Sequence, residues 1–510
     1  MIRKRRRMGC MLALVLTLAL SLTSCSRDNV SIESPDINEV LTTWDNDFPE
    51  VVCAYSIVDE FPADLKMVED AINKITIPTI NVRITLRPVP MADSYTFLTY
   101  ARTIGEKIDI VCTFAGSSLN EESAYELTDF LNADGRGIKE TVDSRFIDAI
   151  SVNKKIFALP TINGKAVSTQ IAFRKDIIDK HNIDTEFLNM ENDFSRVMEM
   201  LRGIEDIYQK IKSEEPDIYP VVIGYPTSLL HLIRYDGLGN DIGVILGDDN
   251  RNIVNLYESN EFLSLITIMR DWYKKGYFMP ETGISPESST SLIKNGRAFS
   301  TFERSEIGFD VQLKTSTGYE MQCIKLVPPL LTTSDFHSFV WMVPRTATEP
   351  EAAMEFLNLM YTNKEIVNLL CFGIEGTHYQ IRQDGTIEYP DGIDALNTTY
   401  SHAQYWEFGN TLLGHVLSGN PPDYNVQLQK NNENAPVSLA LGFSFDATEV
   451  QVETAAIWQI TGKYLPGLLT GALDETAYPS FLEELKEAGI DRIIVEKQRQ
   501  YDLWLGNDIS

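Results

Sequence analysis

Histidine and cysteine are scarce in this chain of 510 residues, which contains six of each. Neither set shows the spacing of a zinc site or a redox pair. The motifs HExxH and GxSxG and the phosphate-binding Walker loop are absent, and the glycines of GLGNDIG (237–243) are wrongly spaced for a dinucleotide fingerprint. Sequence alone does not exclude a pair of catalytic carboxylates. Nothing in the sequence calls for catalysis, and we expect no metal, no organic cofactor and no enzymatic activity.

Four cysteines lie beyond the N-terminal region and are far apart in sequence: Cys53, Cys112, Cys323 and Cys371. The first two fall in predicted strands. Free cysteine is among the most buried residue types and packs like a small apolar side chain. We therefore expect buried thiols rather than disulfides.

Basic residues are also in deficit, with 44 Lys and Arg against 73 Asp and Glu. Residues 1–24 hold five of the basic residues and no acidic ones, so the net charge of −29 becomes −34 without them. Such a surface repels nucleic acid and anionic lipid, which argues against both as partners. The hydrophobic share of 44% still indicates a packed protein, and the length predicts two or more lobes.

A long hydrophobic span is missing as well. The apolar run Met8–Leu22 follows five basic residues, Arg3–Arg7, and is shorter than the ~20 residues that a membrane helix needs. This pattern indicates a secretory signal peptide over 1–24. Leu22-Thr23-Ser24-Cys25 resembles the lipobox of bacterial lipoproteins, which implies lipidation of Cys25; the alternative is an ordinary signal with an incidental cysteine. Residues 25–48 are polar and acidic and are predicted to form a flexible tether.

The segment after the tether alternates strands and helices. Strands are predicted at 51–58, 80–89 and 108–114, and amphipathic helices between them over 62–75 and about 95–104. This order implies parallel strands in an α/β lobe. Ligands bind such sheets beyond the carboxyl ends of the strands, which here are 55–60 and 113–118.

A second α/β lobe is predicted beyond an extended crossing at 154–179. Its expected elements are helices at 194–211 and 262–275 and a strand at 219–225, and a return crossing is expected near 296–303. A further helix, over 350–362, begins with proline. We predict lobe 1 over 49–160 and about 304–364, and lobe 2 over 161–303 and about 365–510, including a helical C-terminal region.

Several segments resemble the extracellular solute-binding proteins of carbohydrate-type ABC transporters, in a lipoprotein branch with a distinctive C-terminal domain. The most specific are FGIEGTHY (372–379) and VEKQRQYDLW (495–504), and less specific ones include DLKMVEDAINKI, GEKIDIVCTF, IFALPTINGKA and LGFSFDATEV. The resemblance covers most of 50–505. It implies a two-lobed periplasmic-binding-protein-like fold of type II, with hinge-linked lobes and a ligand cleft between them.

The implied function is that of a lipid-anchored monomer on the extracellular face of the cell membrane. It would capture a carbohydrate, expected to be an oligosaccharide, and deliver it to the transmembrane subunits of an ABC importer. Two alternatives remain open at this stage: a surface sensor that presents its ligand to a signalling partner, and a surface glycoside hydrolase. The lobes are expected to rotate about crossings near 159–168, 299–303 and 362–370.

A sugar cleft needs aromatic platforms together with carboxylates and amides. Trp341 is the first candidate for a platform because it lies beside an expected crossing. Glu375, His378 and Tyr379 of the FGIEGTHY segment are predicted either to face the cleft or to brace one lobe against the other. The remaining candidates are aromatic residues at predicted strand ends, at crossings or in the YWEFGN cluster: Tyr55, Phe114, Tyr225, Tyr235, Phe302 and Trp406.

Overall fold

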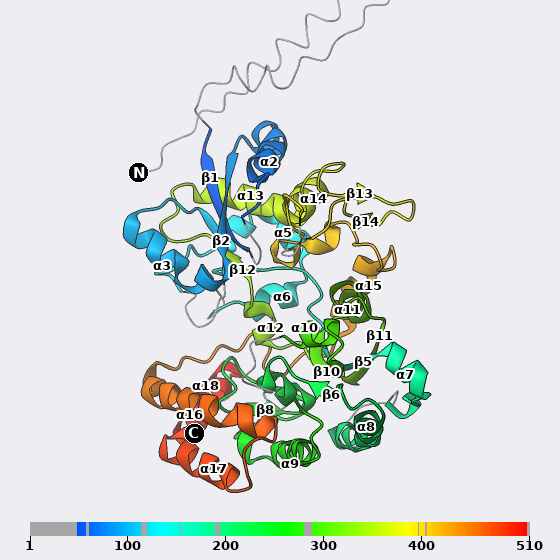
Figure 1. The fold of residues 1–510 in the computed structure, drawn as a ribbon. Helices are drawn as coiled ribbons and strands as arrows, with labels where there is room; N and C mark the ends of the chain where they lie inside the picture. Colours follow the sequence, from blue (N-terminus) through cyan, green and yellow to red (C-terminus); the bar gives the residue numbers. More distant parts are fainter. Residues whose placement is uncertain are drawn as a thin grey trace, which may run out of the picture. The chain divides into compact units, whose positions relative to one another are not determined.

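The computed structural model describes residues 48–57, 61–113, 120–152, 155–188, 194–279, 288–395, 397–402 and 405–506. Phe48–Ser510 forms one compact unit. Within this unit the buried apolar side chains form two large cores, each built around its own sheet. We call the first lobe 1 (49–160 and 331–435) and the second lobe 2 (168–327 and 440–506); they occupy the upper and lower halves of Figure 1.

Lobe 1 contains a five-stranded sheet with the order β2-β1-β3-β12-β4. As predicted, its first three strands are parallel, and β12 and β4 add antiparallel pairs at the other side. Strand β1 lies in the middle of the parallel part and is almost entirely buried, as its unbroken apolar sequence predicts. The strands are β1 (Glu50–Ile57), β2 (Arg83–Pro90), β3 (Ile110–Thr113), β4 (Leu159–Pro160) and β12 (Val340–Met342).

The helices of lobe 1 begin and end where local signals predict. Helix α13 (Pro350–Thr362) has proline in its first turn, where the missing N–H costs nothing. Asn363 then caps α14 (Lys364–Phe372) by accepting from the amides of Glu365 and Ile366. The other helices of this lobe are α2 (Leu65–Ile80), α3 (Ser94–Ile104), α4 (Thr128–Leu131), α5 (Arg136–Thr141), α6 (Ser144–Ala149), α12 (Thr333–His337) and α15 (Tyr424–Asn434).

Lobe 2 contains a four-stranded sheet with the order β11-β5-β10-β6, in which β5 runs antiparallel to both neighbours. A small antiparallel sheet, β7-β8-β9, packs beside it within the same core. The larger sheet consists of β5 (Ser168–Arg174), β6 (Tyr219–Val222), β10 (Ala298–Ser305) and β11 (Met321–Val327). The smaller one consists of β7 (Tyr235–Asp236), β8 (Val244–Leu246) and β9 (Ile253–Val254).

Helices cover the sheets of lobe 2, and the C-terminal region belongs to its core. Phe481 and Tyr501 are fully buried there. The helices are α7 (Lys175–His181), α8 (Phe194–Glu214), α9 (Asn260–Lys274), α10 (Ser289–Lys294), α11 (Phe309–Thr317), α16 (Gln451–Leu469), α17 (Ala477–Glu487) and α18 (Ile490–Trp504). Among the residues that the structure describes, no helix combines the length and the apolar character needed to cross a bilayer.

The lobe boundaries differ from the prediction in two places. After β10 the chain adds one more strand to lobe 2, β11, so it returns to lobe 1 at 328–332 and not near 304. Residues 365–435 pack into the core of lobe 1, because the apolar face of α14 lies against α2 and α13. The predicted crossings at 299–303 and 362–370 are therefore wrong, since they lie inside β10 and α14.

Three segments join the lobes, at 161–167, 328–332 and 436–439, and the first agrees with the prediction. The second and third bind each other, since the amide of Leu331 donates to Pro436 O and the amide of Ser438 donates to Leu331 O. Asn432 of α15 holds the first, because its Oδ1 accepts from the amides of Lys165 and Ala166 at 2.9 Å. The three crossings thus form one connected strip.

The four cysteines beyond the N-terminal region are free thiols. Cys53 and Cys112 are buried in the neighbouring strands β1 and β3, as expected. Burial raises the pKa of both thiols well above the usual value, so the thiolate is disfavoured at both positions.

Candidate ligand cavity

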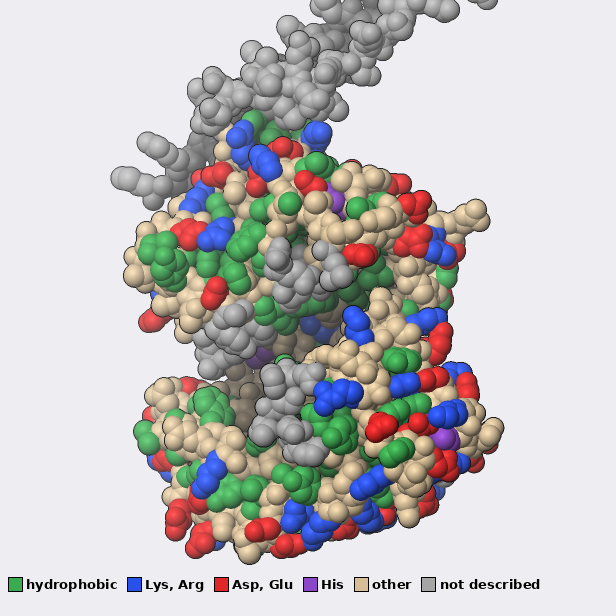
Figure 2. Space-filling view, viewed as in Figure 1, with side chains coloured by type: hydrophobic (Ala, Val, Ile, Leu, Met, Phe, Trp, Pro, Cys, Tyr) green, Lys and Arg blue, Asp and Glu red, His purple; other side chains and the backbone are tan. Residues whose placement is uncertain are grey.

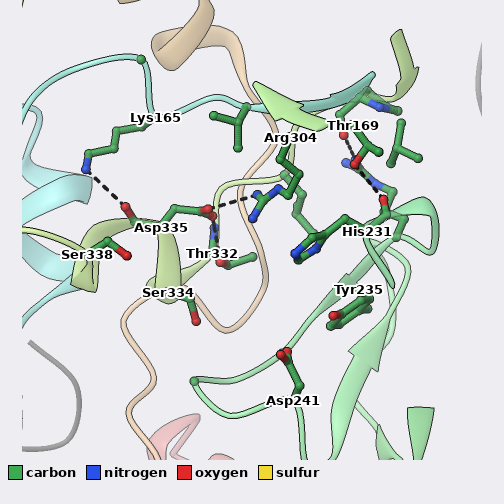
Figure 3. A pocket seen from close by; sticks show the side chains of 18 of the residues that line it. Lys165, Thr169, His231, Tyr235, Asp241, Arg304, Thr332, Ser334, Asp335 and Ser338 are labelled. Carbon is green, nitrogen blue, oxygen red and sulfur yellow. Dashed lines mark hydrogen bonds and ion pairs between the residues drawn. The ribbon is translucent and has the colours of Figure 1, made fainter. Parts of the chain in front are cut away.

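A cavity of about 450 Å³ lies between the lobes, where the first and second crossings run (Figure 3). Figure 2 shows the surface hollowed between the two halves of the described chain. The wall of the cavity comes from both lobes and from the crossings themselves. The lining includes Asn163, Lys165, Thr169, His231, Arg234, Tyr235, Gly237, Asp241, Arg304, Pro328, Thr332, Ser334, Asp335, Ser338 and Phe339.

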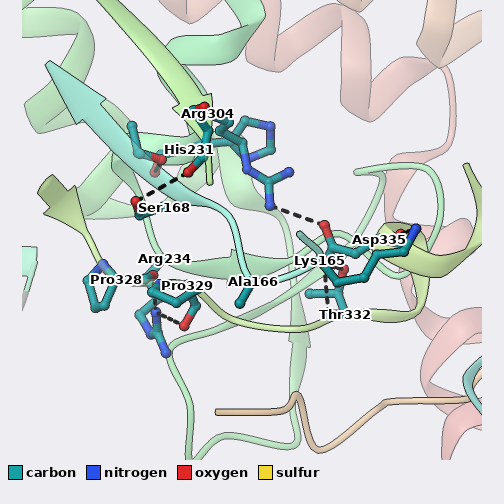
Figure 4. A network of polar contacts seen from close by, with 12 residues as sticks. Lys165, Ala166, Ser168, His231, Arg234, Arg304, Pro328, Pro329, Thr332 and Asp335 are labelled. Carbon is teal, nitrogen blue, oxygen red and sulfur yellow. Dashed lines mark hydrogen bonds and ion pairs between the residues drawn. The ribbon is translucent and has the colours of Figure 1, made fainter. Parts of the chain in front are cut away.

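An ion pair spans the cavity between the lobes. The Arg304 guanidinium, on β10 of lobe 2, donates to Asp335 Oδ1 on α12 of lobe 1 at 3.2 Å (Figure 4). The other carboxylate oxygen of Asp335 accepts from the amide and the hydroxyl of Thr332, both at 2.8 Å, and closes a capping box at the start of α12. Helix α12 therefore holds the carboxylate still, while the partly exposed guanidinium faces the cavity.

Lys165 lies in the first crossing and is almost completely buried. Its Nζ donates to Thr161 Oγ1 and to the backbone oxygen of Asp335, both at 3.3 Å. Burial lowers the pKa of this ammonium to about 8, although Asp335 and other nearby groups raise it. A cationic donor thus ties the first crossing to α12.

His231 and Tyr235 form a stacked pair in the wall of lobe 2, with ring centroids 6.0 Å apart and planes within 8°. The backbone oxygen of His231 accepts from Thr169 Oγ1 at 2.8 Å, which fixes this wall to β5. Burial, together with the smaller effect of the nearby Arg304 charge, lowers the pKa of the His231 imidazole to about 3. His231 is therefore a neutral ring at physiological pH, suited to stacking and hydrogen bonding.

The loop between β7 and β8, residues 237–243, brings Asp241 to the same side of the cavity as Tyr235 (Figure 3). A Cβ on Gly237 would lie 1.9 Å from Asp241 Oδ1, so glycine is required for the loop to fold over itself. Asp241 itself has a left-handed backbone, with φ 56°. The Asp241 side chain is exposed, but partial desolvation raises the pKa of its carboxyl group to about 6, so above that pH it adds an ionised hydrogen-bond acceptor to the wall.

Phe339 supplies an aromatic face from lobe 1. It lines the cavity with a left-handed backbone (φ 56°), which is rare for a bulky residue. Its ring packs edge-on against Trp406, with centroids 4.3 Å apart. Strain of this kind concentrates at functional sites, where the surrounding packing maintains it.

A second hollow of about 580 Å³ adjoins the first through Arg304, which lines both. Tyr225, at the end of β6, lies in this second hollow with 80% of its surface exposed. Ser289 there donates to Glu303 Oε1 at 2.9 Å. The two hollows together give a polar surface with aromatic groups along lobe 2.

Three of the predicted aromatic platforms are wrong. Trp341 is fully buried in the core of lobe 1, where its Nε1 donates to Glu407 O at 2.8 Å. Tyr55 is also buried, with its ring 5.1 Å from that of Phe408. The segment 405–410 covers this edge of the sheet, so aromatic residues at these strand ends pack against it and do not face a ligand. Phe302 is core as well.

The FGIEGTHY segment forms the predicted tight backbone, with Gly373 and Gly376 both at φ 76°. Glu375 is exposed on this turn, whereas His378 is buried and its imidazole lies 3.3 Å from Asp64 Oδ2. Tyr379 packs against His415. All of these contacts lie inside lobe 1, and none of the three side chains lines the cavity described above. The segment joins parts of one lobe and does not brace the two lobes.

The other candidates fall into three groups. Tyr235 lines the cavity with the 9% of its surface that is exposed, and the rest of its ring packs into the core of lobe 2. Trp406 lies behind Phe339 and lines a smaller hollow of about 80 Å³. Phe114 lies outside the described residues, as does Cys25.

Sequence reasoning missed Lys165, Asp241, Arg304, Asp335 and Phe339. The spacing of Thr332 and Asp335 is that of a capping box, which could have predicted the start of α12 but not the ion pair across the cavity. The described residues contain no group of three or more His, Cys, Asp or Glu side chains that could hold a metal ion.

Residues 439–506 match the family described as "Domain of unknown function (DUF3502)". Over 483 residues, the chain is 25% identical to a carbohydrate ABC transporter substrate-binding protein of Streptococcus pneumoniae serotype 4, with 90% of this chain and 91% of the relative covered. The expected resemblance to these binding proteins is confirmed.

The solved structures that resemble this one show the same fold. The N-glycan transport solute binding protein (NgtS) from Streptococcus pneumoniae superposes with a TM-score of 0.78 at 23% identity, over 90% of this chain and 99% of that one. Its complex with Man5GlcNAc gives 0.69 at 22% identity, over 91% and 100%. An HMO binding, ABC-transporter associated solute binding protein from Bifidobacterium longum infantis gives a TM-score of 0.60 at 12% identity, over 90% of this chain and 99% of that one. The predicted two-lobed solute-binding fold is therefore confirmed.

Proposed function

We propose that this protein is an extracellular binding protein that captures an oligosaccharide between its lobes and delivers it to an ABC importer. The observation that carries the proposal is the polar cavity between the lobes, which combines the Arg304 guanidinium and the Asp241 carboxylate with the rings of Tyr235 and Phe339. The carbohydrates that appear in the names of the relatives support an oligosaccharide as the class of ligand.

The wall suits sugar chemistry group by group. A pyranose offers apolar ring faces, which Tyr235 and Phe339 can cover, and hydroxyl groups, which need both donors and acceptors. Arg304 has donors only, whereas the exposed Asp241 has acceptors only. The hollow around Tyr225 continues this surface and gives room for further sugar units.

Closure would occur by rotation about the strip formed by the three crossings. Backbone bonds link the second crossing to the third, and Asn432 links the first to α15, so the strip bends as one unit. The protein acts as a monomer in this scheme, and small-angle scattering should show a smaller radius of gyration with saturating sugar. An unchanged radius would contradict closure.

The ligand is bound and released intact, without a metal or an organic cofactor. Both oxygens of Asp335 are already engaged, one by Arg304 and the other by Thr332, so this carboxylate positions groups and does not transfer protons. Asp241 remains as an acceptor for sugar hydroxyls.

The test is a thermal-shift screen with Man5GlcNAc and a panel of other oligosaccharides, followed by calorimetry on the best ligand. A sugar at 100 times its dissociation constant should stabilise the protein by about 2.7 kcal/mol. Chromatography should then recover the sugar unchanged. Stabilisation by none of the sugars, or release of sugar fragments, would contradict the proposal.

We further propose that Cys25 becomes the lipidated N-terminus that anchors the protein beside its permease. Leu22-Thr23-Ser24-Cys25 after a basic and then an apolar segment supports this. Intact mass of the cell-derived protein should show a lipid on Cys25. An unmodified N-terminus at another residue would contradict the anchor.

A further inference from the structure

A lysine is buried where the C-terminal helix packs on lobe 2. Helix α18 turns Ile490, Ile493, Lys497 and Tyr501 toward the core, so Lys497 occupies a position where the pattern calls for an apolar residue. Lys497 has no exposed surface. Lysine is almost never fully buried unless it is paired, so the partners of this ammonium need an explanation.

The partners of Lys497 lie on the loop that lines the cavity. Its Nζ donates to Asn240 Oδ1 at 2.5 Å and to Gly243 O at 3.1 Å, and it lies 5.1 Å from the centre of the Phe445 ring. Asn240 Oδ1 also accepts from the amide of Ile242 at 3.1 Å. One ammonium therefore holds the middle and the end of the 237–243 loop.

The loop has a conformation that needs such support. Leu238 and Asp241 both have left-handed backbones, with φ 49° and 56°, in addition to Gly239 and Gly243. Non-glycine residues with such a backbone are strained, and they persist only where their surroundings determine them. Asp241, whose carboxylate reaches the cavity, comes directly after Asn240.

Helix α18 also holds the strands beside the loop. Gln498 Oε1 accepts from the amide of Ile253 in β9 at 2.7 Å, and β9 pairs with β8, which follows the loop. A Cβ on Gly243 would lie 3.0 Å from Ile494 Cγ1, so the end of the loop packs closely on the helix. The contacts of α18 thus continue on both sides of Lys497.

We propose that Lys497 is a positioning residue for the cavity, through which the C-terminal domain holds the 237–243 loop in the shape that presents Asp241 to the ligand. This rests on the proposed function for the ligand itself, but the support of the loop does not. Burial lowers the pKa of Lys497 to about 7, and Asp241 and Asp236 oppose this shift. The region matched as a domain of unknown function would thus be part of the binding site without touching the ligand.

The first test measures amide hydrogen exchange without any ligand in the full chain, in Lys497→Met and in a control, Lys463→Met. Lys463 is exposed on α16 of the same domain and pairs with Glu484. Loss of a charged hydrogen bond should speed exchange in 237–243 by about tenfold in Lys497→Met. Exchange in β5 and β10 should stay at the wild-type rate, and the control should change nothing.

Two results would overturn the proposal: wild-type exchange rates in 237–243, or an equal increase throughout lobe 2, which would make Lys497 an ordinary core residue. Asn240→Ala removes the acceptor from the loop side and provides the second variant if Lys497→Met fails to fold. It should produce the same local increase in exchange.

The second test uses Man5GlcNAc as the probe in calorimetry. Lys497→Met and Asn240→Ala should each weaken binding by about tenfold, and the double variant by clearly less than the product of the two effects, because the Lys497–Asn240 bond is lost in both. Wild-type affinity in both variants would contradict the positioning role. If the wild-type protein does not bind this sugar, the result counts against the proposed ligand, and the exchange measurement still decides whether Lys497 holds the loop.

Discussion

The two lobes contribute to one cavity in different ways. Lobe 2 supplies rings and charges from strand ends and from one strained loop: His231, Tyr235, Asp241 and Arg304. Lobe 1 supplies a short helix with Asp335 and one strained aromatic residue, Phe339, while its large strand-end aromatics are buried. The difference arises because the segment 405–410 covers the edge of the sheet in lobe 1. A strand end therefore predicts a ligand contact only where no other segment covers it.

The largest expected effect is on the stability of lobe 1. Trp341→Ala should lower the free energy of unfolding by about 3–5 kcal/mol, since it removes a fully buried ring and leaves a cavity. Oligosaccharide affinity should not change in the folded fraction. Denaturant unfolding and calorimetry on the same variant separate the two quantities.

Trp458→Ala is the matched control, because Trp458 is 57% exposed on α16. It should change stability by no more than about 0.5 kcal/mol. Normal stability with lost affinity in Trp341→Ala would restore Trp341 as a platform and break the contrast between the lobes.

The next effect concerns the carboxyl group of Glu407, which belongs to the covering segment 405–410. Glu407 is fully buried and accepts from the amide of Ser56 at 2.8 Å, and burial raises its pKa to about 7. The native state thus binds the extra proton, and stability is lost as the pH rises from about 4.5 to about 7. Above about pH 7 the free energy of unfolding is therefore lower by about 3 kcal/mol than below pH 4.5.

Glu407→Gln keeps the acceptor for Ser56 but cannot ionise. It should be more stable than the wild-type protein by about 3 kcal/mol at pH 8, and the difference should shrink toward pH 4.5. Unfolding curves at the two pH values measure this. Glu375→Gln, on an exposed turn of the same lobe, is the control and should give no such trend. A pH-independent difference for Glu407→Gln would contradict the buried proton.

The smallest of the three effects is on binding. Arg304→Met removes the guanidinium from lobe 2 but leaves Asp335 bound to Thr332, so α12 stays in place. Affinity for the bound sugar should fall by roughly 30-fold, about 2 kcal/mol, with little change in stability. Arg382→Met, in an exposed ion pair of lobe 1, is the control. Unchanged affinity in Arg304→Met would place the ligand elsewhere.

Periodic patterns predicted much of the fold. The parallel strands β1, β2 and β3 and the start of α13 at Pro350 follow from local sequence, because a buried strand and a first-turn proline are determined by nearby residues. The point at which the chain returns to lobe 1 could not be predicted from local sequence. It depends on whether β11 pairs with β5, a contact between residues about 150 positions apart.

The site was harder to predict, and of the aromatic candidates within the described residues only Tyr235 lines the main cavity. Trp341 and Tyr55 lie within β12 and β1, but residues far away in sequence cover them. Arg304 and Asp335 are separated by 31 positions and meet only because two crossings bring the lobes together. Burial and pairing at such a distance are properties of the fold and leave no local pattern.

The most direct test of the central claim is a crystal structure of the protein with an oligosaccharide that stabilises it. We predict that a sugar ring lies against Tyr235 or Phe339, with hydroxyl groups within hydrogen-bonding distance of Arg304 and Asp241. A sugar bound at the Glu375 turn or elsewhere on the outside of either lobe, with the cavity between the lobes empty, would contradict the account.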